Sequence, residues 1–573
     1  MIQPRLPNRL LRPDLLERLL VFMTLGLGLI HAWMGRYAMN PDGISYLDVG
    51  DSFFRRDWAN AVNAWWSPLY PWILGTVLGV SKPSPRWEFP LVHAINFVIF
   101  GIALFAFRWL LQGFLQFNHE RIAGAKAGDM ENLPDWAFVL LAYPIFWWIA
   151  LQIETLYDVS PDLSVMICFS LAAGMLLRLQ SRDRLWKFAL FGVILGIGYW
   201  TKAVLFPLGF VILAVGFWWR RSDSTWRRGM LVSGVAFLCV AAPLILLLSK
   251  QKHRFTFGDS GRVNYAWNVS PRTQTRNWQG REAQSGTPLH PTRQLLSHPP
   301  LFEFDGPVVG TYPPWTDPSY WNEGLKGHFQ LKAQIEVLSS TVPAELRLLL
   351  RAEPGLLVGI IVLALLSGYV WWSNLGMVWP VIAMSATGLA MYLPLIENDR
   401  YLGGFLLVLF LTLIAAAQFR PDVKRSAIYV ACAVFVAMAL DTADYTVRVV
   451  TSHYAIPGTG PNSTWQDVIA AEQLWRMGVQ PGDKIAVIAD GTGAYWARLA
   501  KLRIVDEIMD MNHGVREFWN SPPEARQNVY RVFAQSHATV VVGMCPAAIP
   551  DGWQPIEGTP YCVRSLRPPQ GFF

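Results

Sequence analysis

Long apolar stretches separated by short polar links fill most of the chain up to residue 442. A membrane-spanning helix needs about 20 apolar residues. Eleven stretches come near this length, at 17–37, 88–111, 136–152, 161–179, 186–201, 203–219, 229–249, 354–373, 376–396, 401–418 and 426–442. Two longer polar segments, 38–87 and 250–350, interrupt the series. The pattern predicts a polytopic α-helical membrane protein with about 11 transmembrane helices.

Lysine and arginine gather in five of the polar segments, at 5–18, 121–126, 178–187, 220–228 and 420–425. In membrane proteins these residues concentrate on the cytoplasmic side. With the N-terminus in the cytoplasm, all five segments fall on that side. We therefore expect a multi-pass protein of the cell inner or plasma membrane. Segments 38–87 and 250–350 and the chain after 443 then lie outside the cytoplasm.

The composition agrees with a membrane protein and gives no reason to expect nucleic-acid binding. Hydrophobic residues make up 53% of the chain and charged residues only 16%, whereas soluble domains carry about a quarter charged residues. The 27 tryptophans suit the interfacial belts of a membrane protein. The net charge of +7 comes from basic links between apolar stretches, and no nucleic-acid-binding motif is present. We expect no nucleic-acid partner.

The chain changes character after residue 463, where strand-like and helix-like segments alternate. KIAVIAD (484–490), LRIVDEI (502–508) and HATVVVGM (537–544) predict strands, and amphipathic segments between them predict helices. This order predicts a small α/β domain with a mainly parallel sheet. We therefore divide the chain into a transmembrane domain, 1–442, which includes outer loops 38–87 and 250–350, and a C-terminal extracytoplasmic domain, 443–573.

Two cysteines of the C-terminal domain, Cys545 and Cys562, have two alternative states. In an extracytoplasmic domain they can form a disulfide. Alternatively they are two free buried thiols.

An acidic segment, NPDGISYLDVGDSFFRRDW (40–58), follows the first apolar stretch directly. Its periodicity predicts a helix at the membrane surface, with Asp48 and Asp51 on one face because they are three residues apart. We interpret Asp48, Asp51 and Asp57 as facing water. Asp42 lies before this helix, in a turn beside Gly43, where it acts either as a helix cap or as a functional group.

Several motifs resemble the GT-C integral-membrane glycosyltransferases, a superfamily that includes protein O-mannosyltransferases and lipid A aminoarabinose transferases. They are PDGISY (41–46), WWSPLYPW (65–72), DVSPDLSV (158–165), GYWTKA (198–203) and ENDRYLGG (397–404). The family's first outer loop commonly begins with an acidic pair. Asp42 matches the first acid, whereas Gly43 replaces the second.

The resemblance implies transfer of a sugar from a polyprenyl-phosphate-linked donor to a hydroxyl acceptor on the outer face of the membrane, with inversion. The phosphate leaving group is anionic and needs cations to stabilise it. Lys202 and Arg400 fit this need, and we add Tyr401 and Arg254 to the donor-binding residues. The competing interpretations are snorkelling of Lys202, a local salt bridge between Arg400 and Glu397 or Asp399, and attraction of Arg254 to lipid headgroups.

The acceptor hydroxyl needs a general base, and a carboxylate at a partly desolvated interface suits that role. We assign it to Asp42. The residues expected to contact the acceptor or the sugar are Asp158, Asp162, Tyr46 and Tyr70. The implied partners are a lipid-linked sugar donor, membrane lipids, and a glycan, lipid or protein acceptor.

The histidines of the long loop, His253, His290, His298 and His328, lack the spacing of a zinc site. We expect no cofactor and no metal, with a divalent cation on outer-loop carboxylates as the alternative. The alternative function is a transporter or flippase of lipid-linked sugars. Transporters place ionisable residues within their spans, whereas here the charges cluster at span ends.

Overall fold

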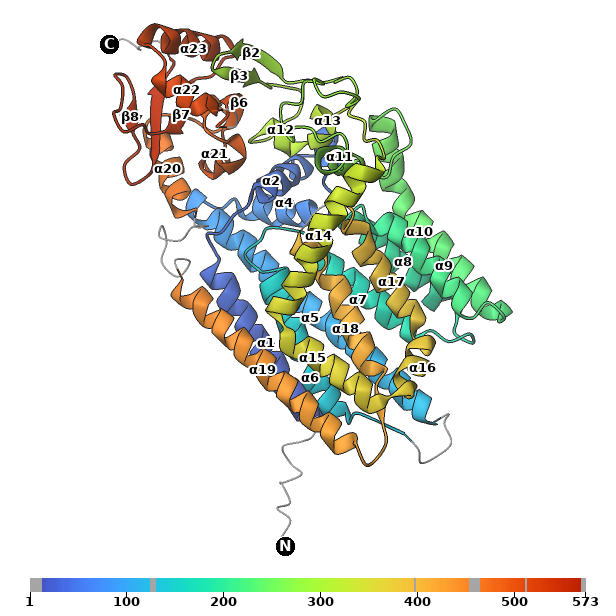
Figure 1. Ribbon diagram of the computed structural model, residues 1–573. Helices are drawn as coiled ribbons and strands as arrows, with labels where there is room; N and C mark the ends of the chain where they lie inside the picture. The colour runs from blue at the N-terminus through green and yellow to red at the C-terminus, as the bar shows by residue number, and fades with distance from the viewer. Residues whose placement is uncertain (1–12, 124–129, 396–397, 453–463, 511–512, 568–573) are drawn as a thin grey trace.

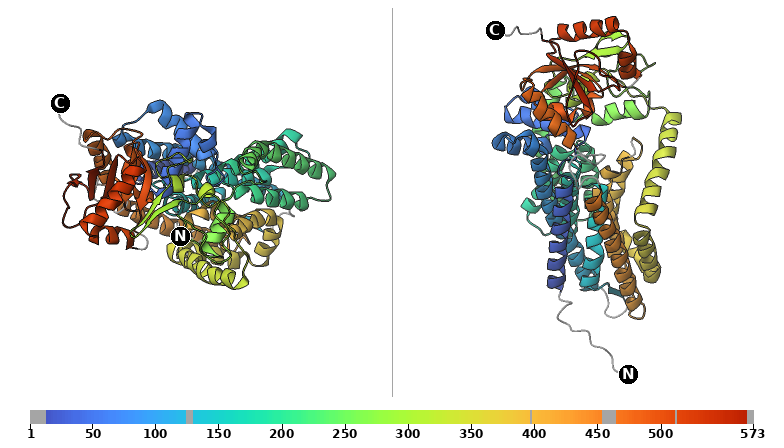
Figure 2. Two further views of the ribbon diagram at one scale, coloured as in Figure 1. Left: turned by 90° about the horizontal axis from the view of Figure 1, so that it is seen from above. Right: turned by 90° about the vertical axis from the view of Figure 1, so that its left-hand side faces the viewer.

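The computed structural model describes residues 13–123, 130–395, 398–452, 464–510 and 513–567. A bundle of helices forms most of the molecule, and the C-terminal sheet domain covers the end of the bundle opposite the N-terminus (Figures 1 and 2). After α10 the long loop lies at the same end as this domain, and its last helix, α14, runs back along the bundle to α15 (Figure 1).

A helix occupies each of the eleven predicted stretches. These helices are α1 (Pro13–Met34), α5 (Pro85–Ala123), α6 (Asp135–Trp148) with its π-helical continuation Ile149–Ile153, α7 (Asp162–Arg178), α8 (Leu185–Thr201), α9 (Leu205–Trp219), α10 (Ser224–Gln251), α15 (Pro354–Ser367) with α16 (Tyr369–Met377), α17 (Trp379–Tyr392), α18 (Gly403–Ala415) and α19 (Lys424–Thr451).

Length and composition allow five described helices to cross a membrane, namely α1, α5, α6 with its continuation, α10 and α19. The bent pair α15–α16 makes six if it is one span; its 104° bend lies at Gly368, whose φ of +63° suits glycine. Helices α8, α9 and α18 are shorter apolar helices. The protein is a multi-pass membrane protein, as predicted.

The first outer segment is helical and packs onto the bundle. It contains α2 (Pro41–Phe54), α3 (Trp58–Ala61) and α4 (Leu69–Ser81). Helices α2 and α4 cross in close contact, because a Cβ added at Gly75 would lie 2.0 Å from the backbone oxygen of Gly50. Asp42 lies within the first turn of α2, and the residue at the N-cap is Asn40. The prediction that Asp42 lies in a turn before this helix was therefore wrong.

The long loop also carries secondary structure. Its elements are α11 (Ser260–Asn268), β2 (Arg293–Ser297), β3 (Pro300–Glu303), α12 (Pro313–Thr316), α13 (Pro318–Trp321) and α14 (Leu331–Ala352). The β2–β3 hairpin joins the sheet of the C-terminal domain through β6. A two-stranded sheet, β1 (Glu131–Asn132) with β4 (Gln418–Phe419), joins two further links of the bundle.

The C-terminal domain contains a seven-stranded sheet in the order β2-β3-β6-β5-β7-β9-β8. Its own strands are β5 (Lys484–Ile488), β6 (Arg503–Ile508), β7 (Val540–Met544), β8 (Gln554–Pro555) and β9 (Tyr561–Ser565), and its main helices are α20 (Trp465–Arg476), α21 (Tyr495–Leu499), α22 (Gly514–Asn520) and α23 (Pro523–Gln535).

The three predicted strands are β5, β6 and β7, and they pair in parallel. The other pairs are antiparallel. The prediction of a mainly parallel sheet was therefore wrong, because a hairpin from the long loop extends one edge and β9 reverses direction at the other.

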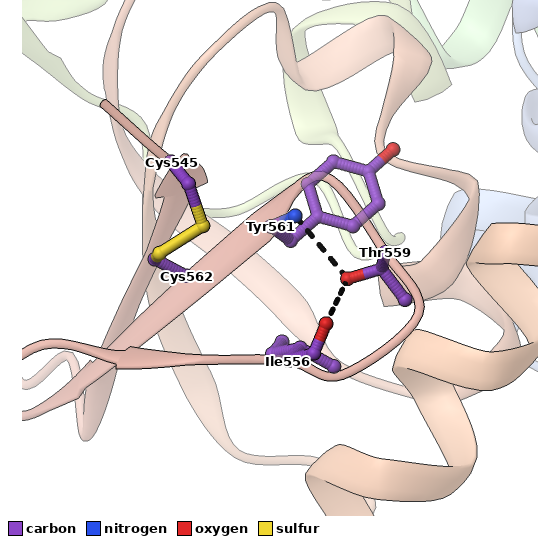
Figure 3. The surroundings of a disulfide bond; sticks show 5 residues. All are labelled: Cys545, Ile556, Thr559, Tyr561 and Cys562. Carbon is purple, nitrogen blue, oxygen red and sulfur yellow. Dashed lines mark hydrogen bonds between the residues drawn. A yellow bond between two sulfur atoms is a disulfide. The ribbon is translucent and has the colours of Figure 1, made fainter. Parts of the chain in front are cut away.

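Cys545 and Cys562 form a disulfide (Figure 3). Cys545 follows β7 and Cys562 lies in β9, and these two strands are neighbours in the sheet. The backbone N–H of Cys545 also donates to the carbonyl of Pro560, at 2.9 Å. Of the two alternative states predicted for this pair, the structure has the disulfide.

A buried arginine joins the C-terminal domain to the bundle. Arg498 of α21 is only 2% exposed. Its Nη1 binds Asp48 Oδ1 at 2.9 Å and Asp51 Oδ2 at 2.6 Å, and its Nε binds Glu88 Oε1 of α5 at 2.8 Å. Lys501 binds the other oxygen of Glu88 at 2.5 Å. The prediction that Asp48 and Asp51 face water was wrong: they share a helix face, but that face binds Arg498.

Replacing Arg498 by alanine leaves two buried carboxylates, Asp48 and Glu88, and the half-buried Asp51 without their shared cation. We expect the free energy of unfolding to fall by about 3–5 kcal/mol, as when one partner of a buried ion pair is removed. Arg86→Ala is the matched control, because it removes an exposed ion pair with Glu472 between α5 and α20 and should cost about 0.2–1 kcal/mol. Thermal unfolding in detergent compares the two; equal losses would contradict the role of Arg498.

Candidate active site

A cavity of about 670 Å³ lies at the ends of several helices. The start of α2, the end of α8, the segment 254–268, Trp315 and the segment 391–401 surround it. Of the nine predicted site residues, seven line this cavity: Asp42, Tyr46, Asp162, Lys202, Arg254, Arg400 and Tyr401. The chain therefore brings together side chains that lie up to 359 positions apart in the sequence.

Four charged side chains form a chain of ion pairs on the cavity wall. Asp42 Oδ2 binds Arg400 Nη2 at 2.7 Å, and Asp162 Oδ1 binds Lys202 Nζ at 2.6 Å. Arg400 Nε lies 3.5 Å from Asp162 Oδ2 and links the two pairs. Arg400 thus contacts two carboxylates from distant helices. Glu397, one partner considered for it, lies outside the described residues.

Close packing of α7 against α18 brings Asp162 and Arg400 together. Asp162 is the first residue of α7, and Arg400 lies in the 3₁₀ turn Asp399–Tyr401 that precedes α18. A Cβ at Gly404 would lie 3.0 Å from Met166 Cα, so only a small residue fits there. Lys202 enters from the end of α8, and its Nζ lies 3.6 Å from the ring centroid of Tyr401. This cation–π contact replaces the snorkelling considered for Lys202.

The ion-pair chain contains two cations and two carboxylates, and its side chains are partly buried. Burial lowers the pKa of Lys202, while the Asp162 carboxylate opposes that shift. Burial acts in the same direction on Arg400, but Asp162 and Asp42 raise its pKa above the ordinary value, so Arg400 stays charged. Glu154, 2% exposed, has its pKa raised well above the usual range by burial and by Asp162.

Tyr70 and Asp158 are the two predicted residues that do not line the cavity. Tyr70 is buried behind Tyr46, with its ring 5.4 Å from that of Tyr46 and its hydroxyl donating to Asn96 Oδ1 at 2.7 Å. Asp158 is half-buried in the loop before α7, where burial raises its pKa and Arg400 opposes the shift. Neither residue lines the cavity: Tyr70 packs against Tyr46, and Asp158 lies near enough to Arg400 to feel its charge.

Arg254 lines the cavity but is paired with acids of the long loop. Its Nη2 lies 2.5 Å from Asp259 Oδ2 and 3.6 Å from Glu323 Oε1. A phosphate would have to compete with these carboxylates for Arg254. The attraction to lipid headgroups that was considered for Arg254 faces the same competition.

Four tryptophans form an aromatic wall of the cavity: Trp65, Trp66, Trp267 and Trp315. Trp267 and Trp315 stack with centroids 5.9 Å apart and planes 10° apart. The indole N–H of Trp315 donates to Asp42 Oδ1 at 3.2 Å. Its backbone oxygen accepts from Ser45 Oγ at 2.7 Å and so fixes the loop on α2. Sequence reasoning missed Trp315, because nothing local distinguishes it from the other tryptophans of the loop.

Gly43, at the position of the second acid, lies in a place where no larger side chain fits. A Cβ there would be 2.5 Å from Met39 Sδ and 2.9 Å from Val159 Cβ. The start of α2 therefore packs directly on the loop before α7. The second carboxylate beside Arg400 comes from Asp162 instead.

Within the described residues, no three His, Cys, Asp or Glu side chains are grouped so that they could hold a metal ion. The carboxylates that line the cavity are bound by cations: Asp42 and Asp162 by Arg400 and Lys202, and Asp259 by Arg254. The expectation that no metal is needed stays a prediction.

Comparison with known proteins gives similarity in structure but not in sequence. No protein-family model matches the chain, and no curated protein does. The oligosaccharyltransferase of Archaeoglobus fulgidus, in complex with Zn and sulfate, has a TM-score of 0.52 and 12% identity, covering 92% of this chain and 67% of that one. ArnT from Cupriavidus metallidurans, in the apo state, has a TM-score of 0.48 and 12% identity over 96% of this chain and 98% of that one. The protein therefore has the fold of this archaeal oligosaccharyltransferase, in agreement with the GT-C-like fold that its motifs predicted.

Gly43→Ala should destabilise the protein, because its Cβ would displace Met39 and Val159. We expect a loss of about 1–3 kcal/mol, as for overpacking in a dense region. Gly101→Ala is the matched control in α5, where an added Cβ meets nothing within 4 Å. Thermal unfolding in detergent measures both, and an unchanged Gly43→Ala variant would show that the start of α2 is free to shift.

Proposed function

We propose that the protein is a glycosyltransferase that moves a sugar from a polyprenyl-phosphate-linked donor to a hydroxyl acceptor on the outer face of the membrane. The chain of ion pairs Asp42–Arg400–Asp162–Lys202 on the cavity wall carries the proposal. The pairs place two cations beside a base candidate in a cavity with an aromatic wall. Fold similarity supports the proposal, but the assignment rests on the site.

In this proposal Lys202 and Arg400 bind the donor phosphate. Both side chains already line the cavity, where they can stabilise the charge that develops on the leaving oxygen. Arg400 can contact two phosphate oxygens, whereas Lys202 acts as a point charge. Tyr401, whose ring lies beside Lys202, and Arg254, if it leaves Asp259, complete the donor site.

Binding of an anionic phosphate would draw Arg400 away from Asp42. Asp42 Oδ1 stays hydrogen-bonded to Trp315, while Oδ2 loses its cation and becomes free to accept a proton. The acceptor oxygen then forms a bond to the anomeric carbon of the sugar, and its proton passes to Asp42. The bond from that carbon to the phosphate oxygen breaks, and the electron pair leaves with the lipid phosphate. Attack opposite the leaving group inverts the anomeric carbon.

Asp162 and Tyr46, which line the cavity, would contact the sugar or the acceptor, and Asp158 and Tyr70 would support them from behind. The disulfide of the C-terminal domain suits an oxidising compartment outside the cytoplasm. That domain and the outer segments lie at the same end of the bundle (Figure 1). These features support an outer-face site in an inner or plasma membrane, with a cytoplasmic N-terminus.

Asp42→Asn should reduce turnover by about 100-fold or more, because a general base contributes 10²–10⁴-fold. Donor binding should be kept or strengthened, since Arg400 loses a competing carboxylate. Purified protein in liposomes would receive polyprenyl-phosphate sugars, with release of lipid phosphate as the readout. Asp57→Asn, on the same segment but outside the cavity, is the control. Unchanged turnover would remove Asp42 as the base, and lipid-sugar movement across the liposome without turnover would indicate a transporter.

Trp315→Phe should keep the stacked ring and remove the N–H that holds Asp42. We expect kcat to fall about 10-fold, the equivalent of one hydrogen bond of 1–1.5 kcal/mol, with the donor KM little changed. Trp267→Phe is the control, because Trp267 lines the same cavity and stacks on Trp315, and its indole N–H is directed to Asn322. Equal kcat losses in both variants would assign the effect to packing alone.

A further inference from the structure

A second, smaller cavity lies between the long loop and the C-terminal sheet. Its volume is about 100 Å³, and it is bounded by the segment 274–282, the β2–β3 hairpin and Met509. Four amide side chains line it: Gln274, Asn277, Gln279 and Gln294. We call it the amide pocket.

The amide pocket adjoins the large cavity across a single stretch of chain. Thr275 lines the large cavity, whereas its neighbours Gln274 and Arg276 line the amide pocket. The stretch 274–276 is thus a wall that both cavities share. Arg276 Nη2 binds Asp490 Oδ2 of the C-terminal domain at 3.0 Å and so fixes this wall. A molecule bound in the amide pocket can therefore extend toward the large cavity.

The amide pocket contains buried polar atoms that no described protein group satisfies. Asn277 is 5% exposed; among the described residues its Oδ1 has no hydrogen-bond partner, and its Nδ2 binds the sulfur of Met509 at 2.9 Å. Glu282 Oε2 is also buried without a partner in the part of the chain that the structure describes. Leaving such atoms unpaired costs free energy, so the pocket suits a ligand that donates hydrogen bonds.

The chemistry of the lining indicates a neutral ligand rich in hydroxyls. Amide side chains both donate and accept hydrogen bonds, which matches the two roles of a hydroxyl group. The charges are balanced within the pocket, because Arg281 and Glu282 have opposite signs and Arg276 is neutralised by Asp490. Phe302 adds an apolar surface that suits the C–H face of a sugar ring.

We propose that the amide pocket is an acceptor subsite, and that the acceptor is a neutral carbohydrate. This inference rests on the proposed function and names its acceptor class. One sugar residue of the acceptor binds in the amide pocket and anchors the oligosaccharide. The hydroxyl that reacts belongs to another part of the oligosaccharide, which reaches the large cavity past Thr275.

Binding of neutral oligosaccharides to the full-length protein in nanodiscs tests the proposal. The probes are tetrasaccharides of α-1,6-mannose, α-1,5-arabinose, α-1,4-glucose and β-1,4-N-acetylglucosamine, and the competing probes are a serine- and threonine-rich peptide and lipid A. Saturation-transfer NMR gives the affinities. At least one tetrasaccharide should bind wild type, and should bind Asn277→Gly at least 10-fold more weakly.

Asn277→Gly tolerates the native backbone, because Asn277 has a φ of +54°. Gln284→Gly is the matched control: Gln284 has a φ of +64°, is exposed in the same loop and lies outside the pocket. It should bind like wild type. An unfolding midpoint close to that of wild type establishes that each variant is folded.

No binding by any tetrasaccharide, or equal binding by Asn277→Gly, overturns the acceptor subsite. Binding of the peptide or of lipid A that depends on Asn277 overturns it too, and assigns the pocket to that acceptor class. Release of lipid phosphate that depends on Asp42 is measured separately. If lipid phosphate is released but no tetrasaccharide binds, only the acceptor subsite is wrong. If no lipid phosphate is released, the proposed function is wrong.

Discussion

Helix α2 is fixed by charge at two points, and the site depends on this constraint. At its first turn Asp42 binds Arg400, and about two and a half turns later Asp51 binds Arg498. Buried ion pairs are expensive to desolvate, so they add little net stability, but breaking one is costly. Such pairs fix the relative positions of the elements they join more than they increase the free energy of unfolding. Here they set where Asp42 lies relative to the bundle on one side and the C-terminal domain on the other.

The ion-pair chain of the cavity wall matches two cations with two carboxylates. Two carboxylates neutralise Arg400 and Lys202 in the structure. An arriving phosphate would replace them as the partner of these cations, and the displaced carboxylates would gain proton affinity as the cations turn away. Binding of the donor and preparation of the base are thus one electrostatic event in the proposed mechanism. Trp315 keeps Asp42 oriented during this exchange, because its hydrogen bond does not involve Arg400.

Much of this arrangement could be predicted from the sequence, because a membrane imposes strong rules on composition. Apolar length located the helices, and the resemblance of the segments at their ends to GT-C motifs selected Asp42, Lys202 and Arg400. Helical spacing placed Asp48 and Asp51 on one face, but their partner Arg498 comes about 450 residues later. No local pattern reveals such a contact. The need for glycine at position 43 could not be predicted either, because it comes from a contact with Val159, which is distant in the sequence.

The C-terminal domain acts on the site through other residues. Among its described residues, 464–510 and 513–567, none lines the large cavity. Arg498 instead holds α2, and Asp490 holds the wall shared by the two cavities. Glu507 accepts the Tyr312 hydroxyl at 2.6 Å and so anchors the loop three residues before Trp315. A domain that fixes the base, its orienting tryptophan and the wall of the amide pocket can shape acceptor recognition without contributing a reacting group.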